Sequence, residues 1–191
     1  LRKGFKRPSR QGRLRGPSKL KEEPMAEALN ISIVTVSDTR TAENDTSGDY
    51  LAEALQAVGH RLVSRSIVID DRYQLRAELS QLIAAPEVQV VLMTGGTGFT
   101  GRDSTPEAVA PLFDTQIQGF GELFRQLSYE EIGTSTLQSR ALGGLANNTL
   151  IFCIPGSTGA CKTAWTGILS SQLDSTHRPC NFAELLLRGH H

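Results

Sequence analysis

Glycines, hydroxyls and an acidic side chain gather in one stretch of this 191-residue sequence, GGTGFTGRDSTP at residues 95–106. Glycines let backbone N–H groups approach a phosphate closely, and the Thr97 hydroxyl adds a further donor. Arg102, Asp103 and Thr105 follow directly. The alternative is a tight turn between a strand and a helix that binds no ligand. We predict a phosphate-binding loop formed by Gly95, Gly96, Thr97 and Gly98.

A second acidic group, Asp70 and Asp71, follows another apolar run. Asp70 and Asp103 in one cleft would suit Mg²⁺, which prefers oxygen ligands and bridges to substrate phosphates. The alternative is that each carboxylate caps a helix N-terminus, where aspartate is common. Capping accounts well for one of the adjacent pair, and the sequence leaves both roles open.

The spacing of apolar residues predicts the elements that must position these groups. Short β-branched runs predict strands, and apolar residues at helical spacing predict helices. The predicted strands are 31–36, 62–69, 88–94 and 149–155, and the predicted helices are 46–58, 75–83, 105–113, 122–132, 135–142 and 158–173. Strands and helices alternate in the first half, which indicates a parallel sheet covered by helices on both faces.

Ligands in open α/β sheets bind outside the carboxyl ends of the strands. Small, polar or acidic residues follow all four predicted strands, and this repetition indicates a site. Further candidates at these ends are Ser37, Asp38, Pro155, Gly156 and Ser157. Ser47 and Gly48 start a helix, where they can cap it or bind an oxyanion. Arg140, after Ser139, can clamp a phosphate bidentately or form a surface or interface ion pair.

The stretch GSTGACKT at residues 156–163 resembles a P-loop at first sight. That motif needs glycine immediately before the lysine, whereas Cys161 precedes Lys162 and its Cβ obstructs the turn that wraps a phosphate. We interpret the stretch as a different loop between a strand and a helix, still able to bind an anion through its amides. A P-loop-like nucleotidase is therefore disfavoured.

Composition limits the classes of function. Apolar residues make up 39% of the chain and charged residues 21%, as in an ordinary globular domain. No apolar run approaches the roughly 20 residues of a membrane-spanning helix. Three cysteines without a C-x-x-C pair indicate neither a disulfide framework nor a zinc site, and favour the cytoplasm.

The charges are distributed unevenly along the chain. Residues 1–24 hold nine basic and two acidic residues, a net of +7, and residues 25–191 hold eleven basic and eighteen acidic residues, a net of −7. The mildly acidic part does not fit a nucleic-acid binder. The first segment has too few apolar residues to form a core. A basic arm for nucleic acid or membrane and a transit peptide are the alternatives, but we favour a leader translated from upstream or vector sequence. We therefore predict a disordered, non-native basic leader over 1–24 and a single domain over 25–191.

Several ordered motifs together resemble the MoaB/MogA family of molybdenum cofactor biosynthesis proteins. The resemblance runs from about residue 31 to 182. The motifs are VTVSDTR (34–40), DTSGDYL (45–51), IVIDDR (67–72), VVLMTGGTGFTGRDSTPEA (90–108), GFGELFRQLSYEEIGTSTLQSRALGG (119–144) and IFCIPGSTGACKTAW (151–165). GTSTLQSRA and RPCNF (178–182) are most similar to the MoaB branch. Thr158 replaces the second proline of the family's frequent P-G-x-P, a departure that touches ligand positioning.

The resemblance implies a three-layer α/β/α fold with a mostly parallel sheet, assembled as a homotrimer or, in MoaB, a homohexamer. It implies Mg-ATP-dependent adenylylation of molybdopterin with release of pyrophosphate. The family's essential carboxylates fall on Asp70 and Asp103, and its glycine loop on 95–98. Ser37, Asp38, Ser47, Gly48, Ser139, Arg140, Pro155 and Gly156 fall on other pocket motifs. The alternative function is a catalytically idle molybdopterin-binding or scaffold protein that contacts other proteins of the pathway.

Overall fold

A six-stranded sheet forms the middle of the molecule, and its strands follow the order β2-β1-β3-β6-β5-β4. The computed structural model describes residues 26–188, so the predicted leader at 1–24 lies outside the described residues. The strands are β1 (Asn30–Val36), β2 (Arg61–Val68), β3 (Val90–Thr94), β4 (Thr115–Gln116), β5 (Leu142–Ala146) and β6 (Thr149–Ile154). β2, β1, β3 and β6 are parallel, and β5 and β4 add an antiparallel edge.

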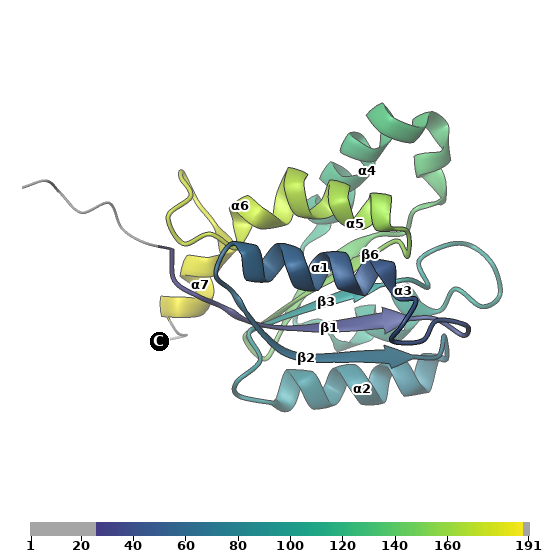
Figure 1. The fold of residues 1–191 in the computed structure, drawn as a ribbon, viewed down its shortest axis with the longest axis horizontal. Helices are drawn as coiled ribbons and strands as arrows, with labels where there is room; N and C mark the ends of the chain where they lie inside the picture. Colours follow the sequence, from purple (N-terminus) through teal and green to yellow (C-terminus); the bar gives the residue numbers. More distant parts are fainter. Residues whose placement is uncertain (1–25, 189–191) are drawn as a thin grey trace, which may run out of the picture.

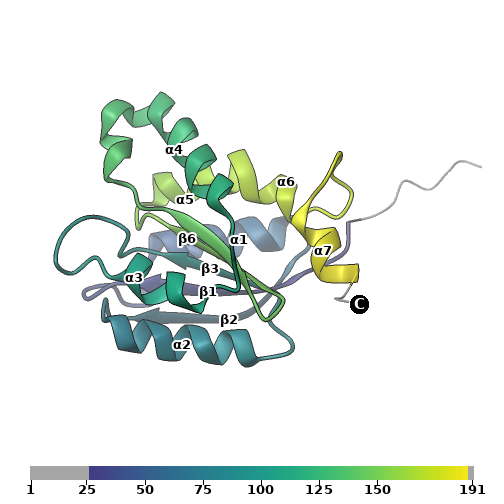
Figure 2. The ribbon, with the colours of Figure 1, turned by 180° about the vertical axis from the view of Figure 1, so that it is seen from behind.

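Helices cover both faces of this sheet, which confirms the predicted three-layer α/β/α fold (Figures 1 and 2). The α-helices are α1 (Thr46–Ala57), α2 (Arg72–Ala84), α3 (Thr105–Val109), α4 (Gln118–Ile132), α5 (Thr158–Ala164), α6 (Ser170–Gln172) and α7 (Phe182–Arg188). Short 3₁₀ turns follow two of them, η1 (Ala110–Leu112) and η2 (Gly133–Gln138), and a π-helical turn, η3 (Trp165–Leu169), joins α5 to α6. None of the described helices is long and apolar enough to span a bilayer.

Alternation along the central strands builds a separate apolar core on each face of the sheet. On β3, Val90 and Leu92 pack with α1, α4, α5 and η3, while Val91 and Met93 pack with α2 and α3. All four side chains are fully buried. Successive side chains of a strand point to opposite faces, and a strand buried on both faces is therefore apolar throughout. The sheet is consequently a rigid platform with all four parallel strands ending on one side.

The predicted helix over 135–142 is wrong. Residues 133–138 form the 3₁₀ turn η2, and β5 begins at Leu142. β5 reads LGGLA, and its two glycines conceal the alternating pattern by which a strand is recognised. The predicted helix over 105–113 ends earlier, as α3 and η1, and the predicted helix over 158–173 contains the π-helical turn.

Candidate functional site

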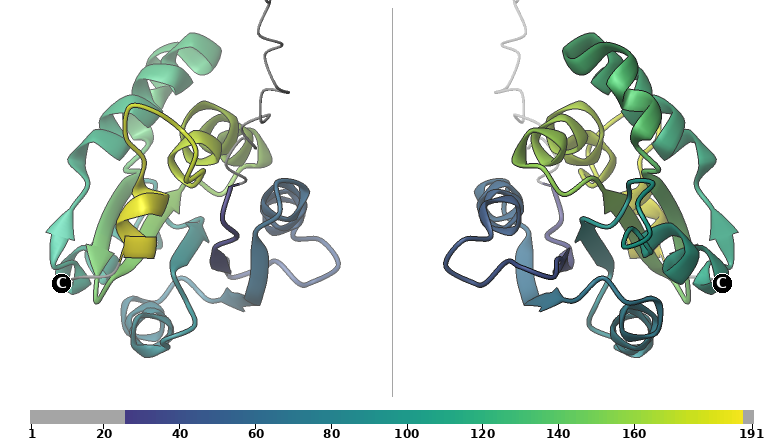
Figure 3. Two further views of the ribbon diagram at one scale, coloured as in Figure 1. Left: turned by 90° about the vertical axis from the view of Figure 1, so that its left-hand side faces the viewer. Right: turned by 90° about the vertical axis from the view of Figure 1, so that its right-hand side faces the viewer.

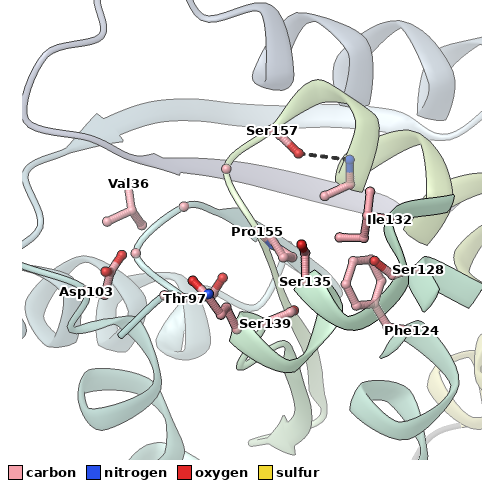
Figure 4. A pocket seen from close by; sticks show the side chains of 16 residues that line it. Val36, Thr97, Asp103, Phe124, Ser128, Ile132, Ser135, Ser139, Pro155 and Ser157 are labelled. Carbon is pink, nitrogen blue, oxygen red and sulfur yellow. Dashed lines mark hydrogen bonds between the residues drawn. The ribbon is translucent and has the colours of Figure 1, made fainter. Parts of the chain in front are cut away.

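A cavity of about 400 Å³ opens at the carboxyl edge of the parallel strands. The right-hand view in Figure 3 faces this end of the molecule. Strand ends and the loops after them form one wall, and α4 with η2 forms the other (Figure 4). The first wall contains Val36, Gly95, Gly96, Thr97, Gly98, Asp103, Pro155, Gly156, Ser157 and Ala160, and the second contains Phe124, Ser128, Ile132, Ser135, Gln138 and Ser139.

The glycine loop leaves β3 in a conformation that favours glycine. Gly95 has φ 109° and Gly96 has φ 64°. A Cβ on Gly95 would collide with the carbonyl oxygen of Val36, and one on Gly96 would lie 2.6 Å from Asp70 Oδ2. Thr105 holds the loop from the start of α3, donating its hydroxyl to Gly95 O at 2.9 Å and its N–H to Gly96 O at 3.0 Å. The loop therefore presents its backbone to the cavity, as phosphate-binding loops do.

Asp103 lines the cavity, and Figure 4 shows it beside the glycine loop. Its Oδ2 accepts hydrogen bonds from the Thr100 N–H at 2.8 Å and the Thr100 hydroxyl at 2.6 Å. Partial burial raises the pKa of Asp103, but these bonds, the Gly98 backbone and the nearby Arg140 charge outweigh it, so the pKa is lowered overall. The carboxylate is thus ionised at neutral pH.

Asp70 lies behind the glycine loop, outside the cavity lining. Its Oδ1 accepts the Ser104 N–H at 2.9 Å and the Ser104 hydroxyl at 2.5 Å, and Ser104 is the neighbour of Asp103. Asp71 takes the capping role instead, accepting from the N–H groups of Tyr73 and Gln74 at the start of α2. The structure thus separates the adjacent pair into one helix cap and one carboxylate joined to the loop that carries Asp103.

The donor set around the two carboxylates fits the magnesium ion that accompanies a nucleotide. Among residues 26–188, no three His, Cys, Asp or Glu side chains lie together as a metal cluster. Mg²⁺ is usually bound by one or two carboxylates together with waters and substrate phosphates, so a third protein ligand is unnecessary. Because two carboxylates are enough, Asp70 and Asp103 remain the predicted magnesium ligands.

Asp38 and Arg102 join the end of β1 to the far side of the glycine loop. Arg102 bonds both carboxylate oxygens of Asp38, at 2.9 Å and 2.6 Å. Asp38 also accepts the Asp70 N–H at 3.1 Å. Ser37 turns its hydroxyl away from the cavity, accepting the N–H groups of Thr39 and Arg40. These predicted site residues therefore brace the loop ends and do not line the cavity.

Ser47 and Gly48 act from the N-terminus of α1. The Ser47 hydroxyl donates to Gly156 O at 2.9 Å, which fixes a residue of the cavity wall. The Gly48 N–H donates to Asp45 at 3.0 Å, so Gly48 belongs to the helix cap. Ser157 caps α5 by accepting the Ala160 N–H, the bond drawn in Figure 4. Pro155 O accepts the hydroxyl of Thr94 at 3.1 Å.

Several functional positions escaped sequence reasoning. Of the wall formed by α4 and η2, only Ser139 was predicted. The rest was missed because its orientation depends on packing across the sheet, although the small polar run GTSTLQS was a signal. Asp45, whose side chain is 0% exposed, accepts from Thr35, Gly48 and Arg65. Asp45 holds Arg65 of the next strand, β2, and no local sequence pattern indicates that contact.

The sheet order, the glycine loop and the cavity at the carboxyl edge define a three-layer α/β/α protein with a ligand site built from strand ends. A family model described as a probable molybdopterin binding domain matches residues 32–175. The chain belongs to this family of molybdenum cofactor biosynthesis proteins, and it is similar to proteins named molybdenum cofactor biosynthesis protein B.

Two relatives illustrate the degree of similarity. The chain is 59% identical over 152 residues to a molybdenum cofactor biosynthesis protein B of Escherichia coli, covering 80% of this chain and 89% of that protein. It is 46% identical over 146 residues to the protein of that name from Bacillus cereus, covering 76% and 86%.

Solved structures share the fold. A crystal structure of a molybdenum cofactor biosynthesis protein B superposes with a TM-score of 0.80 at 41% identity, covering 86% of this chain and 99% of that chain. A tungsten cofactor synthesizing protein, MoaB from Pyrococcus furiosus, gives a TM-score of 0.69 at 36% identity, covering 76% and 92%. A MogA structure gives 0.69 at 29% identity, covering 75% and 94%.

Proposed function

We propose that this protein adenylylates molybdopterin with Mg-ATP. The observation that carries the proposal is a glycine loop at the carboxyl edge of the sheet, with Asp103 lining its cavity and Asp70 bonded through Ser104 to the loop that carries Asp103. The family's description as a probable molybdopterin binding domain supplies the pterin substrate. The cavity, at about 400 Å³, lies within the range of small-molecule sites.

In the proposed reaction, an oxygen of the terminal phosphate of molybdopterin forms a bond to the α-phosphorus of ATP. The bond from that phosphorus to the bridging oxygen breaks, and pyrophosphate leaves with the electron pair. The nucleophile is already anionic at neutral pH, so no general base is required. In phosphoryl transfer, positioning and charge stabilisation supply most of the catalysis.

The residues of this chain have defined tasks in that scheme. The Gly95 N–H donates to Ile154 O at 2.9 Å, so backbone N–H groups of residues 96–98 hold phosphate oxygens, and Thr97 adds its hydroxyl. Magnesium, when bound with the nucleotide, supplies positive charge that offsets the charge on the phosphate oxygens. Asp70 and Asp103 would hold it there. Phe124 and Ile132 offer an apolar surface for a ring, and Ser128, Ser135 and Gln138 offer hydrogen-bonding groups beside it.

The direct test mixes purified protein with molybdopterin, Mg²⁺ and ATP and follows adenylylated pterin and pyrophosphate. We expect product, reduced by at least about 100-fold in Asp70→Ala and Asp103→Ala, since loss of one preorganised electrostatic group costs that order. Asp71→Asn is the matched control, because asparagine caps a helix as well as aspartate. Its activity should equal that of the wild type.

A second candidate function uses the same pocket without chemistry. If the protein binds molybdopterin but forms no product, it is a pterin-binding or scaffold protein of the pathway. Asp70→Ala and Asp103→Ala would then leave turnover at zero and change only the affinity for molybdopterin.

We also propose that the protein assembles as the homotrimer or homohexamer implied by the family, which sedimentation of the full chain would test. We propose a cytoplasmic location as well.

A further inference from the structure

Arg140 joins the two walls of the pocket. It follows η2, whose Gln138 belongs to one wall, and it bonds the glycine loop on the other. The Arg140 N–H donates to Thr97 O at 3.0 Å. Its guanidinium Nε donates to Gly98 O at 2.7 Å, and Nη2 donates to Asp103 O at 2.8 Å. One residue therefore bonds the carbonyls at both ends of the 98–103 loop.

Glu107, on α3, engages the remaining nitrogen of that guanidinium. Its carboxylate forms an ion pair with Arg140 Nη1. The side chain of Arg140 is only 24% exposed, and the Phe99 ring lies 5.1 Å from its central carbon. The planar guanidinium thus has an acceptor on each of its three nitrogens and an aromatic ring near its face. These bonds use three of its five N–H groups, all of them on partners within the protein.

We infer that Glu107 and Arg140 form a positioning pair, which holds the 98–103 loop and its Asp103 against the η2 wall. The effect on turnover rests on the proposed function, whereas the effect on the loop does not. The carbonyl oxygens of Gly98 and Asp103 lie at the two ends of a segment that contains the exposed Phe99 and Arg102. Arg102 ties this segment to Asp38 at the end of β1, whereas Arg140 ties it to the opposite wall of the pocket.

The positioning role differs from direct ligation in its physical consequence. A positioning pair sets the location of Asp103, so its loss reduces turnover while the nucleotide keeps its other contacts. A misplacement of 1 Å in a catalytic group costs on the order of 100-fold in rate. A phosphate ligand instead contributes to binding, and its loss weakens nucleotide affinity by roughly 10- to 100-fold.

The test compares Arg140→Ala, Glu107→Ala and the double variant in three measurements: amide hydrogen exchange of residues 98–104 without substrates, the Kd of Mg-ATP without pterin, and kcat. We expect faster exchange in the loop and a fall in kcat of about 100-fold in Arg140→Ala. The Kd should stay within about threefold, since no bond to the nucleotide is lost. The double variant should match Arg140→Ala, because the two residues act as one unit.

Arg178→Ala is the matched control. Arg178 also donates to backbone carbonyls, those of Ser175 at 3.1 Å and His177 at 3.0 Å, and pairs with Glu184 at 3.0 Å, but it touches neither the loop nor the pocket. Its exchange in the loop and its kcat should equal those of the wild type.

Three results would overturn the inference: unchanged loop exchange in Arg140→Ala, a Kd for Mg-ATP raised by 10-fold or more with an ordered loop, or additive effects of the two substitutions. If Arg140→Ala does not fold, Glu107→Ala keeps the arginine and still tests the tie through loop exchange. If the wild type makes no product, the proposed function fails, and loop exchange alone decides the inference.

Discussion

The Ser47 hydroxyl donates to the carbonyl oxygen of Gly156 at 2.9 Å, across 109 residues of sequence. The bond ties the first turn of α1 to the loop after β6, and Arg40 Nη2 supports the same carbonyl from 3.4 Å. Gly156 lies against the glycine loop, since a Cβ there would be 3.2 Å from Gly95 Cα. The glycine loop and the loop after β6 are therefore fixed relative to each other by side chains that do not line the cavity.

Ser47→Ala should weaken substrate binding and the fold by similar amounts. Losing one net hydrogen bond costs about 1 kcal/mol, so KM should rise by roughly 2- to 10-fold and the free energy of unfolding should fall by about the same 1 kcal/mol. Steady-state kinetics and urea denaturation measure the two effects. Ser66→Ala is the control, because its hydroxyl makes a comparable 2.6 Å bond to Glu78 far from the pocket. A KM change equal in both variants would contradict the prediction.

Gly96→Ala should abolish activity while the protein stays folded. The φ of 64° is unfavourable for alanine, and the added Cβ would press on Asp70 Oδ2 and Thr105 Oγ1. The loop must move, and backbone N–H groups lose their alignment with a phosphate. Calorimetry with Mg-ATP should detect no binding. Gly119→Ala, with nothing within 4 Å of its added Cβ, should retain full activity, and a similar loss there would refute the steric argument.

Asp45→Asn should be strongly destabilising. It leaves Arg65 without its buried partner, and breaking a buried pair costs about 3 kcal/mol. Asp49→Asn removes the other partner of the same arginine, but that side chain is 48% exposed, so the cost should stay below about 1 kcal/mol. Denaturation midpoints of the two variants measure the difference, and equal losses would contradict it.

The same substitution should change the acid dependence of stability. Burial raises the pKa of Asp45, but hydrogen bonds from Thr35, Arg65 and Gly48 lower it further, to below its ordinary value of about 3.9. A carboxyl with a lowered folded-state pKa stabilises the fold above the unfolded pKa, and that stabilisation is lost as pH falls through the folded value. The wild type should therefore lose stability below about pH 4, and Asp45→Asn should lose less over the same range.

His60 predicts a second pH effect, which begins near its ordinary pKa of about 6.5 and grows as the pH falls. Its Nδ1 accepts the Leu29 N–H at 3.2 Å, and the ring is 6% exposed. Burial lowers the pKa of His60, and the nearby Asp174 charge offsets part of this. Protonation therefore favours the unfolded chain, so stability is full above about pH 6.5 and falls at lower pH. His60→Gln should flatten this slope in urea denaturation, and an unchanged slope would exclude His60 as its source.

The sequence predicted the parallel strands that carry the site better than it predicted the wall formed by α4 and η2. Apolar β-branched runs located β1, β2, β3 and β6, and the polar residues after them converge as the carboxyl ends of parallel strands must. The sequence did not distinguish the roles of neighbouring residues in the loops after these strands. Asp70 and Asp71 are adjacent and identical in type, and only the tertiary position of Ser104 distinguishes the loop-bound carboxylate from the helix cap.

The second wall depends on contacts that no local pattern encodes. Leu142–Ala146 contains two glycines and becomes a strand because β6 and β4 pair with it. Arg140 was predicted as a phosphate clamp or a surface or interface ion pair; it does pair with Glu107, and its other acceptors belong to a loop about forty residues earlier. Such hydrogen-bond partners are known only from the folded structure. The length of an arginine side chain limits how far away its partner can lie, but the sequence does not identify that partner.

The position of β6 between β3 and β5 has a consequence for synthesis. A nascent chain produces β1, β2 and β3 early, but the partner for the free edge of β3 is completed only when residues 149–154 have emerged. Until then, the apolar strand β3 has unpaired N–H and C=O groups along one edge, and such an edge can pair with a strand of another chain. Newly made molecules crowded on one messenger are thus exposed to mispairing from the end of β3 at residue 94 to the end of β6 at residue 154, about a third of the 191-residue chain, and the pairing of β6 with β3 ends that exposure.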